Sequence, residues 1–304
     1  MNAVSAVNDG ELFDWVGRGG VLLQGERWGS AAGRPVVFLH GGGQTRHAWA
    51  GAARQVAARG FESMAIDTRG HGDSAWAHDG DYSLDAMVAD VATLVETAGT
   101  APVLVGASMG GITTLVGVGE GRIACRALVL VDIAPRVEPE GVARILAFMR
   151  GHPDGFASIE QARAAVAAYN PQRRQAGDGA GLSKNLRLGS DGRYRWHWDP
   201  RLLDDPERAD PSVAVQQQER RIEAARQIRV PVLLVRGAMS DIVSEAGVRE
   251  LLELIPHAEV VEIIQAGHMV AGDRNDVFSD AILSFIARHE ESQKKTVQER
   301  AICI

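Results

Sequence analysis

The chain has 304 residues, of which 45% are apolar and 23% charged, and its formal net charge is −7 at pH 7. This length suits one large α/β domain or two smaller ones, and the negative charge argues against a nucleic-acid partner. No apolar run is long enough to cross a bilayer, so we expect no membrane partner. The two cysteines, Cys125 and Cys303, exclude a disulfide framework and a cysteine-rich metal site, and they favour the reducing cytoplasm as the location.

Short apolar strands and longer helices alternate along most of the chain. The predicted strands are Val21–Arg27, Pro35–Leu39, Phe61–Asp67, Val103–Val105, Ala127–Ile133, Pro231–Arg236 and Ala258–Ile264. The predicted helices are Arg46–Arg59, Ser83–Ala98, Met109–Val118, Ser244–Leu254 and Val270–Arg288. This alternation predicts an α/β fold with a mostly parallel sheet that helices cover on both faces.

Residues 135–215 break the alternation. This stretch is polar and rich in Arg, Asp and Pro, and it has helical patterns over Gly141–Arg150 and Ser158–Ala168. An insertion of this length between two sheet strands is usually functional or independently folded. We therefore predict a cap over the carboxyl edge of the sheet, where open α/β sheets bind ligands. The predicted domains are a core of residues 1–134 and 216–290, a helical cap of residues 135–215 and a flexible tail of residues 291–304.

Residues 106–110, Gly106-Ala107-Ser108-Met109-Gly110, form a G-x-S-x-G pattern directly after an apolar strand. In that context a sharp turn from strand to helix holds the central Ser in a strained, exposed position. The two Gly residues remove side chains where the strand and the helix meet, and the free N–H groups of the helix N-terminus can stabilise a developing negative charge. The pattern therefore predicts that Ser108 is a nucleophile.

A serine nucleophile needs a neighbouring base, and a carboxylate must orient that base. His268 follows the strand that ends at Ile264, so we expect it at the same sheet edge as Ser108. The chain order of nucleophile, acid and histidine favours Asp241, in the loop after the Pro231–Arg236 strand, as the acid. Asp132, which ends the strand before it in the chain, is the alternative acid.

Two backbone N–H groups are predicted to form an oxyanion hole. One belongs to Met109, the residue after the nucleophile, and the other comes from the loop after the Pro35–Leu39 strand. In that loop, His40-Gly41-Gly42-Gly43 offers N–H groups that no side chain covers. We favour Gly42 as the donor, with Gly43 close behind and also a candidate pocket residue.

Three tryptophans, Trp49, Trp196 and Trp198, are candidates for the apolar lining of a substrate pocket. We expect His197, which lies between two of them, to be a packed surface residue. The sequence has no metal-binding spacing, no phosphate-binding loop and no dinucleotide fingerprint, so we expect neither a metal nor a cofactor.

Three loops, taken together with Asp241 and Gly267-His268, resemble the motifs of a known protein family. They are His40–Gly43, the loop Asp67-Thr68-Arg69-Gly70-His71-Gly72-Asp73-Ser74 and Gly106–Gly110. Over residues 12–290 this set resembles the α/β-hydrolase fold superfamily, in the serine-nucleophile branch similar to haloperoxidase-like and epoxide-hydrolase-like proteins, carbon–carbon bond hydrolases and esterases. The resemblance implies a mostly parallel sheet of about eight strands, with a helical cap inserted after the sixth strand. It also implies that the Asp67–Ser74 loop shapes the floor of the active site, with Arg69 and His71 as structural residues.

The residue at the turn sets the chemistry that the resemblance implies. Epoxide hydrolases carry Asp where this chain has Ser108, so an acyl-enzyme is implied rather than an alkyl-enzyme. We expect a cofactor-independent serine hydrolase, carboxylesterase-like, that acts on small or medium carboxylic esters. The same triad would serve a lactone hydrolase, a carbon–carbon bond hydrolase or a perhydrolase, and a hydrolase-fold ligand receptor is the alternative from another class. The expected partner is a small-molecule substrate, and the sequence leaves the oligomeric state open.

Overall fold

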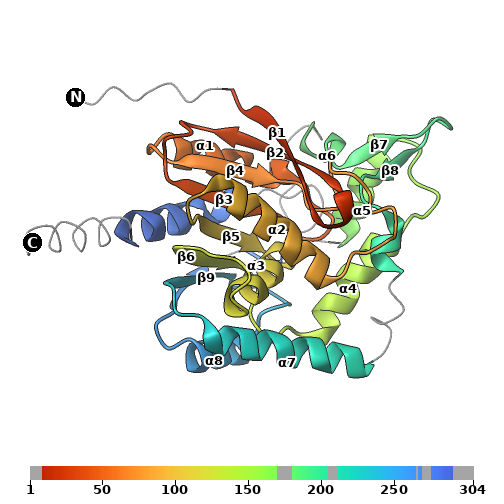
Figure 1. Ribbon diagram of the computed structural model, residues 1–304. Coiled ribbons are helices and arrows are strands. Elements are labelled where there is room, and N and C mark those ends of the chain that lie inside the picture. The colour runs from red at the N-terminus through yellow and green to blue at the C-terminus, as the bar shows by residue number, and fades with distance from the viewer. Residues whose placement is uncertain (1–8, 170–179, 205–210, 265, 269–274, 290–304) are drawn as a thin grey trace, which may run out of the picture.

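The computed structural model describes residues 9–169, 180–204, 211–264, 266–268 and 275–289. Eight strands form one sheet in the order β1-β2-β4-β3-β5-β6-β9-β10 (Figure 1). They are β1 (Glu11–Val16), β2 (Leu22–Trp28), β3 (Pro35–Leu39), β4 (Glu62–Ile66), β5 (Val103–Ala107), β6 (Ala127–Val131), β9 (Val232–Gly237) and β10 (Glu259–Ile263). The pairs β1–β2 and β2–β4 are antiparallel, and every other neighbouring pair is parallel. The predicted sheet of about eight mostly parallel strands is therefore confirmed.

Helices cover both faces of this sheet, as predicted. One face carries α1 (Ala50–Ala57) and the helix over residues 279–289, and the other carries α2 (Leu84–Ala98), α3 (Met109–Gly119), α7 (Pro211–Gln227) and α8 (Glu245–Leu254). The central strands β3, β5 and β6 are buried along their whole length. A strand that is buried on both faces needs apolar residues on both, which explains why these segments are continuous apolar runs rather than alternating ones.

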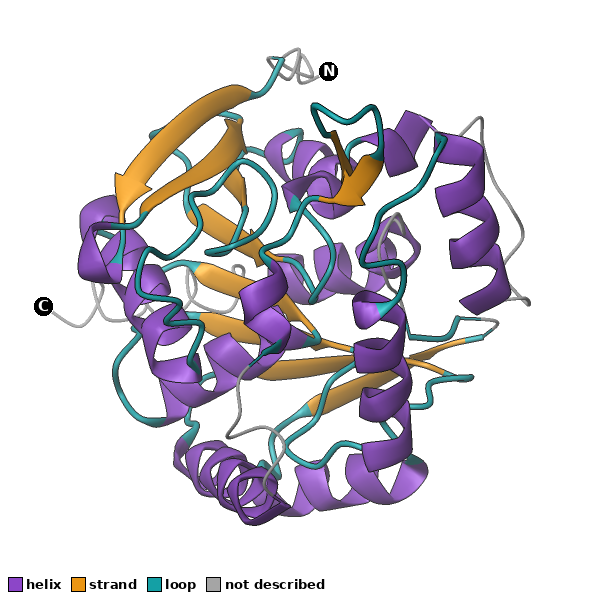
Figure 2. Cartoon of the chain, turned by 90° about the vertical axis from the view of Figure 1, so that its right-hand side faces the viewer, coloured by secondary structure: helices purple, strands orange, loops and turns teal. Residues whose placement is uncertain are grey.

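After β6 the chain leaves the sheet, and the described residues of 135–204 form a further layer, called the cap segment below. Its elements are α4 (Pro139–Arg150), α5 (Ile159–Tyr169), α6 (Ala180–Ser183), the hairpin of β7 (Leu186–Leu188) and β8 (Tyr194–Trp196), and the 3-10 helix η3 (Pro200–Leu203). They gather beside one edge of the sheet in Figure 1, and Figure 2 views the molecule from their side. The insertion point after the sixth strand agrees with the prediction. However, α7 begins at Pro211, inside the range predicted for the cap, and packs against α3.

Both ends of the described chain differ from the prediction in detail. Glu11–Val16, to which no strand was assigned, forms the edge strand β1, because its Trp15 packs into the core and donates its indole N–H to the carbonyl of Asp90 at 3.1 Å. In the described part of the helix predicted over Val270–Arg288, a 3-10 turn η5 (Asn275–Phe278) precedes a helix over residues 279–289. Residues 269–274 and the predicted tail, 291–304, lie outside the described residues.

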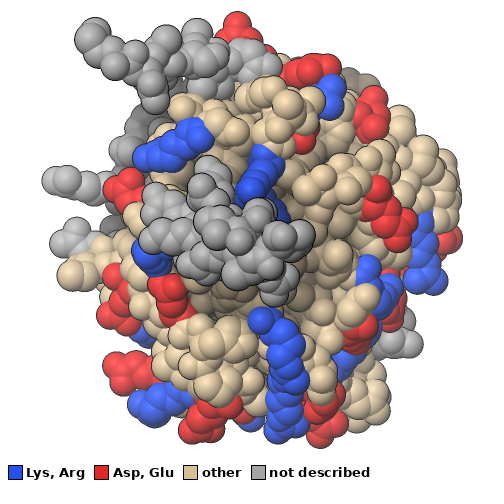
Figure 3. All heavy atoms as spheres, turned by 60° about the vertical axis from the view of Figure 1, so that its left-hand side comes forward, with Lys and Arg blue, Asp and Glu red and all other residues tan. Residues whose placement is uncertain are grey.

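Charges of both signs are mixed on the surface. On the face shown in Figure 3, Lys and Arg side chains lie interspersed with Asp and Glu side chains. Some surface charges of the molecule are paired, as Arg136 is with Glu250 at 2.7 Å between Nε and Oε2. Among the described residues, no helix is both long enough and apolar enough to cross a membrane.

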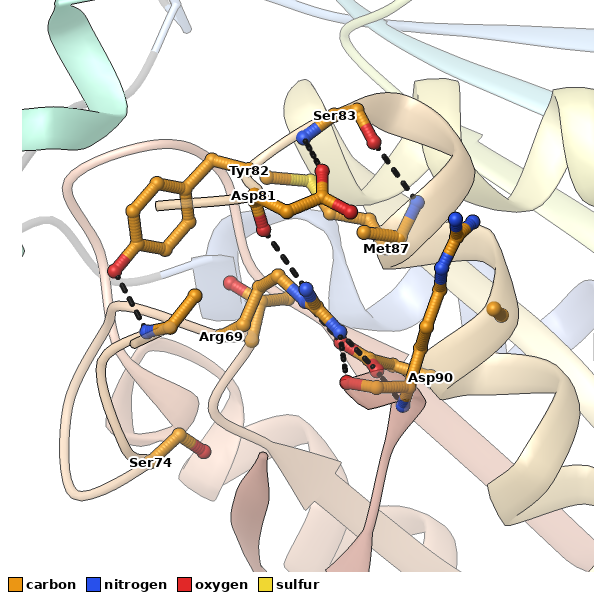
Figure 4. Close-up of polar contacts among 12 residues, drawn as sticks. Arg69, Ser74, Asp81, Tyr82, Ser83, Met87 and Asp90 are labelled. Carbon is orange, nitrogen blue, oxygen red and sulfur yellow. Dashed lines mark hydrogen bonds and ion pairs between the residues drawn. The ribbon is translucent and has the colours of Figure 1, made fainter. Parts of the chain in front are cut away.

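The loop after β4 is anchored by a buried ion pair between Arg69 and Asp90 of α2 (Figure 4). The guanidinium donates from Nε and Nη2 to the two carboxylate oxygens of Asp90, at 2.6 and 2.7 Å. Its remaining donors reach the carbonyls of Asp81 at 2.8 Å and Arg18 at 3.0 Å. Every contact of this side chain is thus internal, which agrees with the structural role that was expected for Arg69.

Replacing Arg69 should therefore be costly. In Arg69→Met the carboxylate of Asp90 stays buried without its cation, and we expect the free energy of unfolding in urea to fall by about 3–5 kcal/mol. Arg249→Met, which breaks an exposed pair with Glu245 on α8, is the control and should change it by less than about 1 kcal/mol. The double variant Arg69→Met/Asp90→Leu should recover part of the loss, and equal losses in Arg69→Met and Arg249→Met would contradict this interpretation.

Candidate active site

Ser108 lies at the turn between β5 and α3, and its backbone is strained. Its φ is +46° and its ψ is −113°, a region that a residue with a side chain rarely occupies. Its N–H donates to the carbonyl of Val131 on the neighbouring strand at 3.1 Å. A side chain at Gly106 would place its Cβ 2.5 Å from the carbonyl oxygen of Gly110, so the strand and the helix can meet this closely only because residue 106 is glycine. The geometry is the strand–turn–helix that the G-x-S-x-G pattern predicts.

Ser108 and His268 line the same small cavity at the carboxyl edge of the sheet, together with Asp132 and Gln44. Ser108 comes from the end of β5, and Asp132 follows directly after β6, the strand beside it. His268 follows β10, far along the chain. The structure therefore brings together two of the predicted site residues, the serine and the histidine, and adds the aspartate that was held as the alternative.

Asp132 is the carboxylate that contacts His268. Its Oδ2 lies 2.8 Å from Nδ1 of His268 and also accepts the hydroxyl of Ser240 at 2.9 Å. Its Oδ1 accepts the N–H of Gly237 at 3.0 Å. A carboxylate that accepts at Nδ1 fixes the proton of the imidazole on that atom, so Nε2 of His268 is left as a lone-pair acceptor. Asp132 also has a positive φ, +50°, so a second strained residue belongs to this site.

The prediction that Asp241 orients His268 is wrong in this structure. The carboxylate of Asp241 forms an ion pair with Arg144 of α4 and is partly exposed. The physical reason is a tight turn after β9, where the N–H of Ser240 donates to the carbonyl of Gly237 at 2.9 Å. That turn directs Ser240 toward Asp132 and leaves the next residue, Asp241, facing the cap segment. Sequence reasoning did not find Ser240, because a serine beside the favoured aspartate gives no separate signal.

The loop after β3 approaches Ser108 at Gly41, where an added Cβ would lie 3.3 Å from Cβ of the serine, and one of its glycine N–H groups has no acceptor among the described residues. The N–H of Gly41 is donated to Oε1 of Gln44 at 3.0 Å, and the N–H of Gly43 is donated to Nε2 of His71 at 3.2 Å. In the described part of the chain, the N–H groups of Gly42 and Met109 have no such acceptor. Gly42 is also half-exposed, whereas the glycines on either side of it are buried. The two predicted oxyanion donors are therefore the ones that the structure leaves available.

Three histidines lie buried behind this loop in a row, with ring centroids 5.0 Å apart between His40 and His71 and 5.7 Å between His71 and His197. Burial lowers the pKa of His40 to about 4 and that of His71 to about 3. Burial also holds the pKa of His197 well below its usual value of 6.5. All three rings are therefore neutral near pH 7.

The predicted pocket residues divide into two groups. Trp198 lies beside the loop after β3, because a Cβ at Gly43 would lie 3.2 Å from its ring, and Trp196 stacks on Trp198 with centroids 5.0 Å apart. Trp49 does not belong to the site. It is fully buried in the core beside Phe38, and its indole N–H donates to the carbonyl of Leu39 at 3.0 Å.

Two cap residues were misjudged or missed by the sequence reasoning. His197 was expected on the surface, but only 1% of it is exposed. Met149 of α4 was not predicted at all, yet its sulfur lies 3.7 Å from the position that a Cβ on Gly42 would take. The two tryptophans that flank His197 in the sequence could have indicated its burial. Nothing in the sequence distinguishes Met149 from the other apolar residues of its helix, so its contact with Gly42 could not be predicted.

Comparisons with known proteins agree on one family. The family model for the alpha/beta hydrolase fold matches residues 34–274. The chain is 30% identical over 273 residues to the esterase Rv0045c of Mycobacterium tuberculosis, covering 82% of this chain and 80% of that relative. It is 29% identical over 265 residues to the sn-1-specific diacylglycerol lipase ABHD11 of Mus musculus, covering 85% of this chain and 83% of that relative. The crystal structure of an alpha/beta hydrolase from Novosphingobium aromaticivorans is similar with a TM-score of 0.75 at 25% identity, covering 92% of this chain and 98% of that one.

From the low pKa values of His40, His71 and His197 we can predict how the free energy of unfolding depends on pH. Because burial lowers their pKa values, the unfolded chain binds more protons than the folded one at pH values between about 4 and the unfolded pKa of about 6.5. The free energy of unfolding should therefore fall as the pH is lowered from 7 to 5.5, by about 1 kcal/mol for each buried imidazole. Urea titrations across this range measure the slope, and His197→Asn should make it shallower. An identical slope in the variant would show that His197 is charged when folded.

Proposed function

Because the chain belongs to the α/β-hydrolase fold family, we propose that it is a cofactor-independent serine hydrolase that cleaves small or medium carboxylic esters. The observation that carries this proposal is the combination of groups at one cavity. A strained Ser108 lies there with His268, which is hydrogen-bonded to Asp132. The N–H groups of Met109, the residue after the serine, and of Gly42, in the loop after β3, have no acceptor among the described residues. These are the nucleophile, base, orienting acid and oxyanion donors of acyl transfer.

In the first half of the reaction, Oγ of Ser108 attacks the carbonyl carbon of the ester while Nε2 of His268 takes the hydroxyl proton. Asp132 stabilises the imidazolium that forms. The carbonyl oxygen becomes an oxyanion, which the N–H groups of Gly42 and Met109 stabilise. When the tetrahedral intermediate collapses, the bond to the alcohol oxygen breaks, and His268 gives its proton to that oxygen. The products of this half are a free alcohol and an acyl group on Ser108.

In the second half, water replaces the alcohol. His268 removes a proton from water as the water oxygen attacks the acyl carbon, and the same two N–H groups stabilise the second oxyanion. Collapse then breaks the bond to Oγ of Ser108, which recovers its proton from His268. The acid product leaves and the enzyme returns to its starting state, so the cycle requires only water as a second reactant.

The surroundings of the loop His40–Gly43, called the oxyanion loop below, favour an apolar acyl group. The sulfur atoms of Met149 and Met109 lie 3.7 and 4.0 Å from the Cβ position on Gly42, and the ring of Trp198 lies beside Gly43. Apolar walls with a few polar groups at the reacting atoms are typical of small-molecule sites. Two relatives are named an esterase and a diacylglycerol lipase, and those names also support an ester as the substrate.

The alternatives receive less support from the described residues. A carbon–carbon bond hydrolase acting on an acidic substrate would need a cation near the pocket, and Arg144 of α4 is instead paired with the carboxylate of Asp241. A lactone is a cyclic ester and requires no change in the mechanism, so lactones belong in the substrate panel. A ligand receptor would turn over its ligand at most about once per binding event, so multiple turnover distinguishes the two classes.

The serine is the first residue to test. A fluorophosphonate probe should label Ser108, and p-nitrophenyl acetate and butyrate should be hydrolysed with multiple turnovers. Ser108→Ala should lose the label and at least about 10⁴-fold of kcat, because no nucleophile remains. Its thermal unfolding curve, compared with that of the wild type, controls for misfolding. Retained hydrolysis by a folded Ser108→Ala would refute the proposal.

The two aspartates provide a matched pair of variants. Asp132→Asn should lower kcat for p-nitrophenyl butyrate by about 10⁴-fold, because the new amide N–H forces His268 into the tautomer that cannot take the serine proton. Asp241→Asn removes only a partly exposed ion pair and should change kcat by less than about fivefold. If Asp241→Asn proves to be the inactive variant, the assignment of Asp132 is wrong.

A further inference from the structure

His197 joins the cap segment to the oxyanion loop, although it is far from the proposed triad in sequence and is not part of it. It lies directly after β8, and its ring is buried against His71 and Trp198. Its Nδ1 accepts the N–H of Gly72 at 2.7 Å. Because Nδ1 is an acceptor, the proton of the neutral ring is on Nε2, and Nε2 faces the carbonyl oxygen of Gly43 at 3.4 Å.

The row of imidazoles holds the oxyanion loop at successive backbone atoms. His40 donates from Nδ1 to the carbonyl of Gly41 at 2.8 Å, and His71 accepts the N–H of Gly43 at 3.2 Å. His197 completes the row at the carbonyl of Gly43. The peptide groups on both sides of Gly42 are thus held in place, and the N–H of Gly42 is the one that remains for a ligand.

Gly43 is the residue that the cap segment supports most closely. Its φ is +75°, and a Cβ there would lie 3.2 Å from the ring of Trp198, so the ring packs directly on the glycine. Two consecutive cap residues, His197 and Trp198, therefore contact the same glycine, one at its carbonyl and one at its Cα. A shift of this dipeptide would move Gly43 and, with it, the adjacent N–H of Gly42.

We propose that His197 is a positioning residue for ester hydrolysis: from the cap segment it holds the Gly43 peptide so that the N–H of Gly42 points at the oxyanion. This inference rests on the proposed function. An oxyanion donor contributes only when it lies within hydrogen-bond distance of the developing charge, and a small displacement weakens it. His197 touches neither the substrate nor Ser108, and its effect passes through the backbone of the loop.

A matched pair of substitutions separates positioning from simple cap attachment. In His197→Asn the amide oxygen can replace Nδ1 as the acceptor for Gly72, because both atoms are bonded to Cγ, but the shorter side chain cannot reach Gly43. Tyr82→Phe removes a different tie between core and cap, the 2.5 Å hydrogen bond from the Tyr82 hydroxyl to Asp199, and leaves the oxyanion loop untouched. His197→Phe removes both hydrogen bonds of the imidazole.

We expect His197→Asn to lower kcat for p-nitrophenyl butyrate by about 10–100-fold with KM unchanged, which is less than the loss of a whole oxyanion donor, about 10²–10³-fold. The inhibition constant of a trifluoromethyl ketone, which forms an oxyanion on Ser108, should rise by the same factor, while that of butyrate should not change. Hydrogen exchange over residues 40–44 should become faster. Tyr82→Phe should match the wild type in each measurement, and His197→Phe should show the kinetic defect together with a lower melting temperature.

Two results would overturn this inference. A wild-type kcat and an unchanged ketone affinity in His197→Asn would show that the ring only ties Gly72 to the cap. An equal loss of kcat in Tyr82→Phe would show that any loosening of the cap has the same effect. If the wild type hydrolyses no ester at all, the proposed function fails, and the hydrogen exchange of residues 40–44, which needs no substrate, still decides whether His197 holds the loop.

Discussion

At Ser108 the backbone turns from β5 into α3 with a φ of +46°, and the other groups of the site are arranged around this turn. A non-glycine residue in such a conformation costs about 1–3 kcal/mol and persists only where the surrounding structure holds it. Close packing holds it here, since a Cβ at Gly110 would lie 2.6 Å from that of Leu39 and a Cβ at Gly111 2.3 Å from Ile133. The helix therefore begins directly after Ser108, and the N–H of Met109, which has no acceptor among the described residues, belongs to the next residue.

The second constraint is the set of hydrogen-bond partners that each histidine near Ser108 has. His40, His71 and His197 use both ring nitrogens on backbone groups, and burial lowers their pKa values. His268 differs because its Nδ1 faces the carboxylate of Asp132, which leaves Nε2 for proton transfer. Three of these four imidazoles thus bind the backbone of the oxyanion loop and its neighbours, and the fourth fits the role of the base. The hydrogen-bond partners of each ring decide which role it can have.

Much of this arrangement follows from the sequence because it depends on local backbone geometry. The sheet, the turn at Ser108 and the place of His268 after a strand are encoded in apolar runs and glycines, and the structure agrees with each. The acid was predicted wrongly because Asp132 and Asp241 both follow strands of the same sheet edge, β6 and β9, which are neighbours. Chain order admits both residues, and only the tight turn at Ser240 decides between them. The predictions for Trp49 and His197 were wrong for a similar reason. Sequence spacing does not show which side of a loop a ring packs against.

The cap segment has two roles in this arrangement. Met149 and Trp198 pack over Gly42 and Gly43, and His197 reaches the backbone of the same loop. In the proposed mechanism, one layer therefore contacts both the space for the acyl group and the support of the oxyanion donor. It follows that a change in the cap can alter the rate of the chemical step as well as the choice of substrate, even when Ser108, Asp132 and His268 stay as they are. This coupling is a physical reason why membership of a fold family does not by itself fix the substrate.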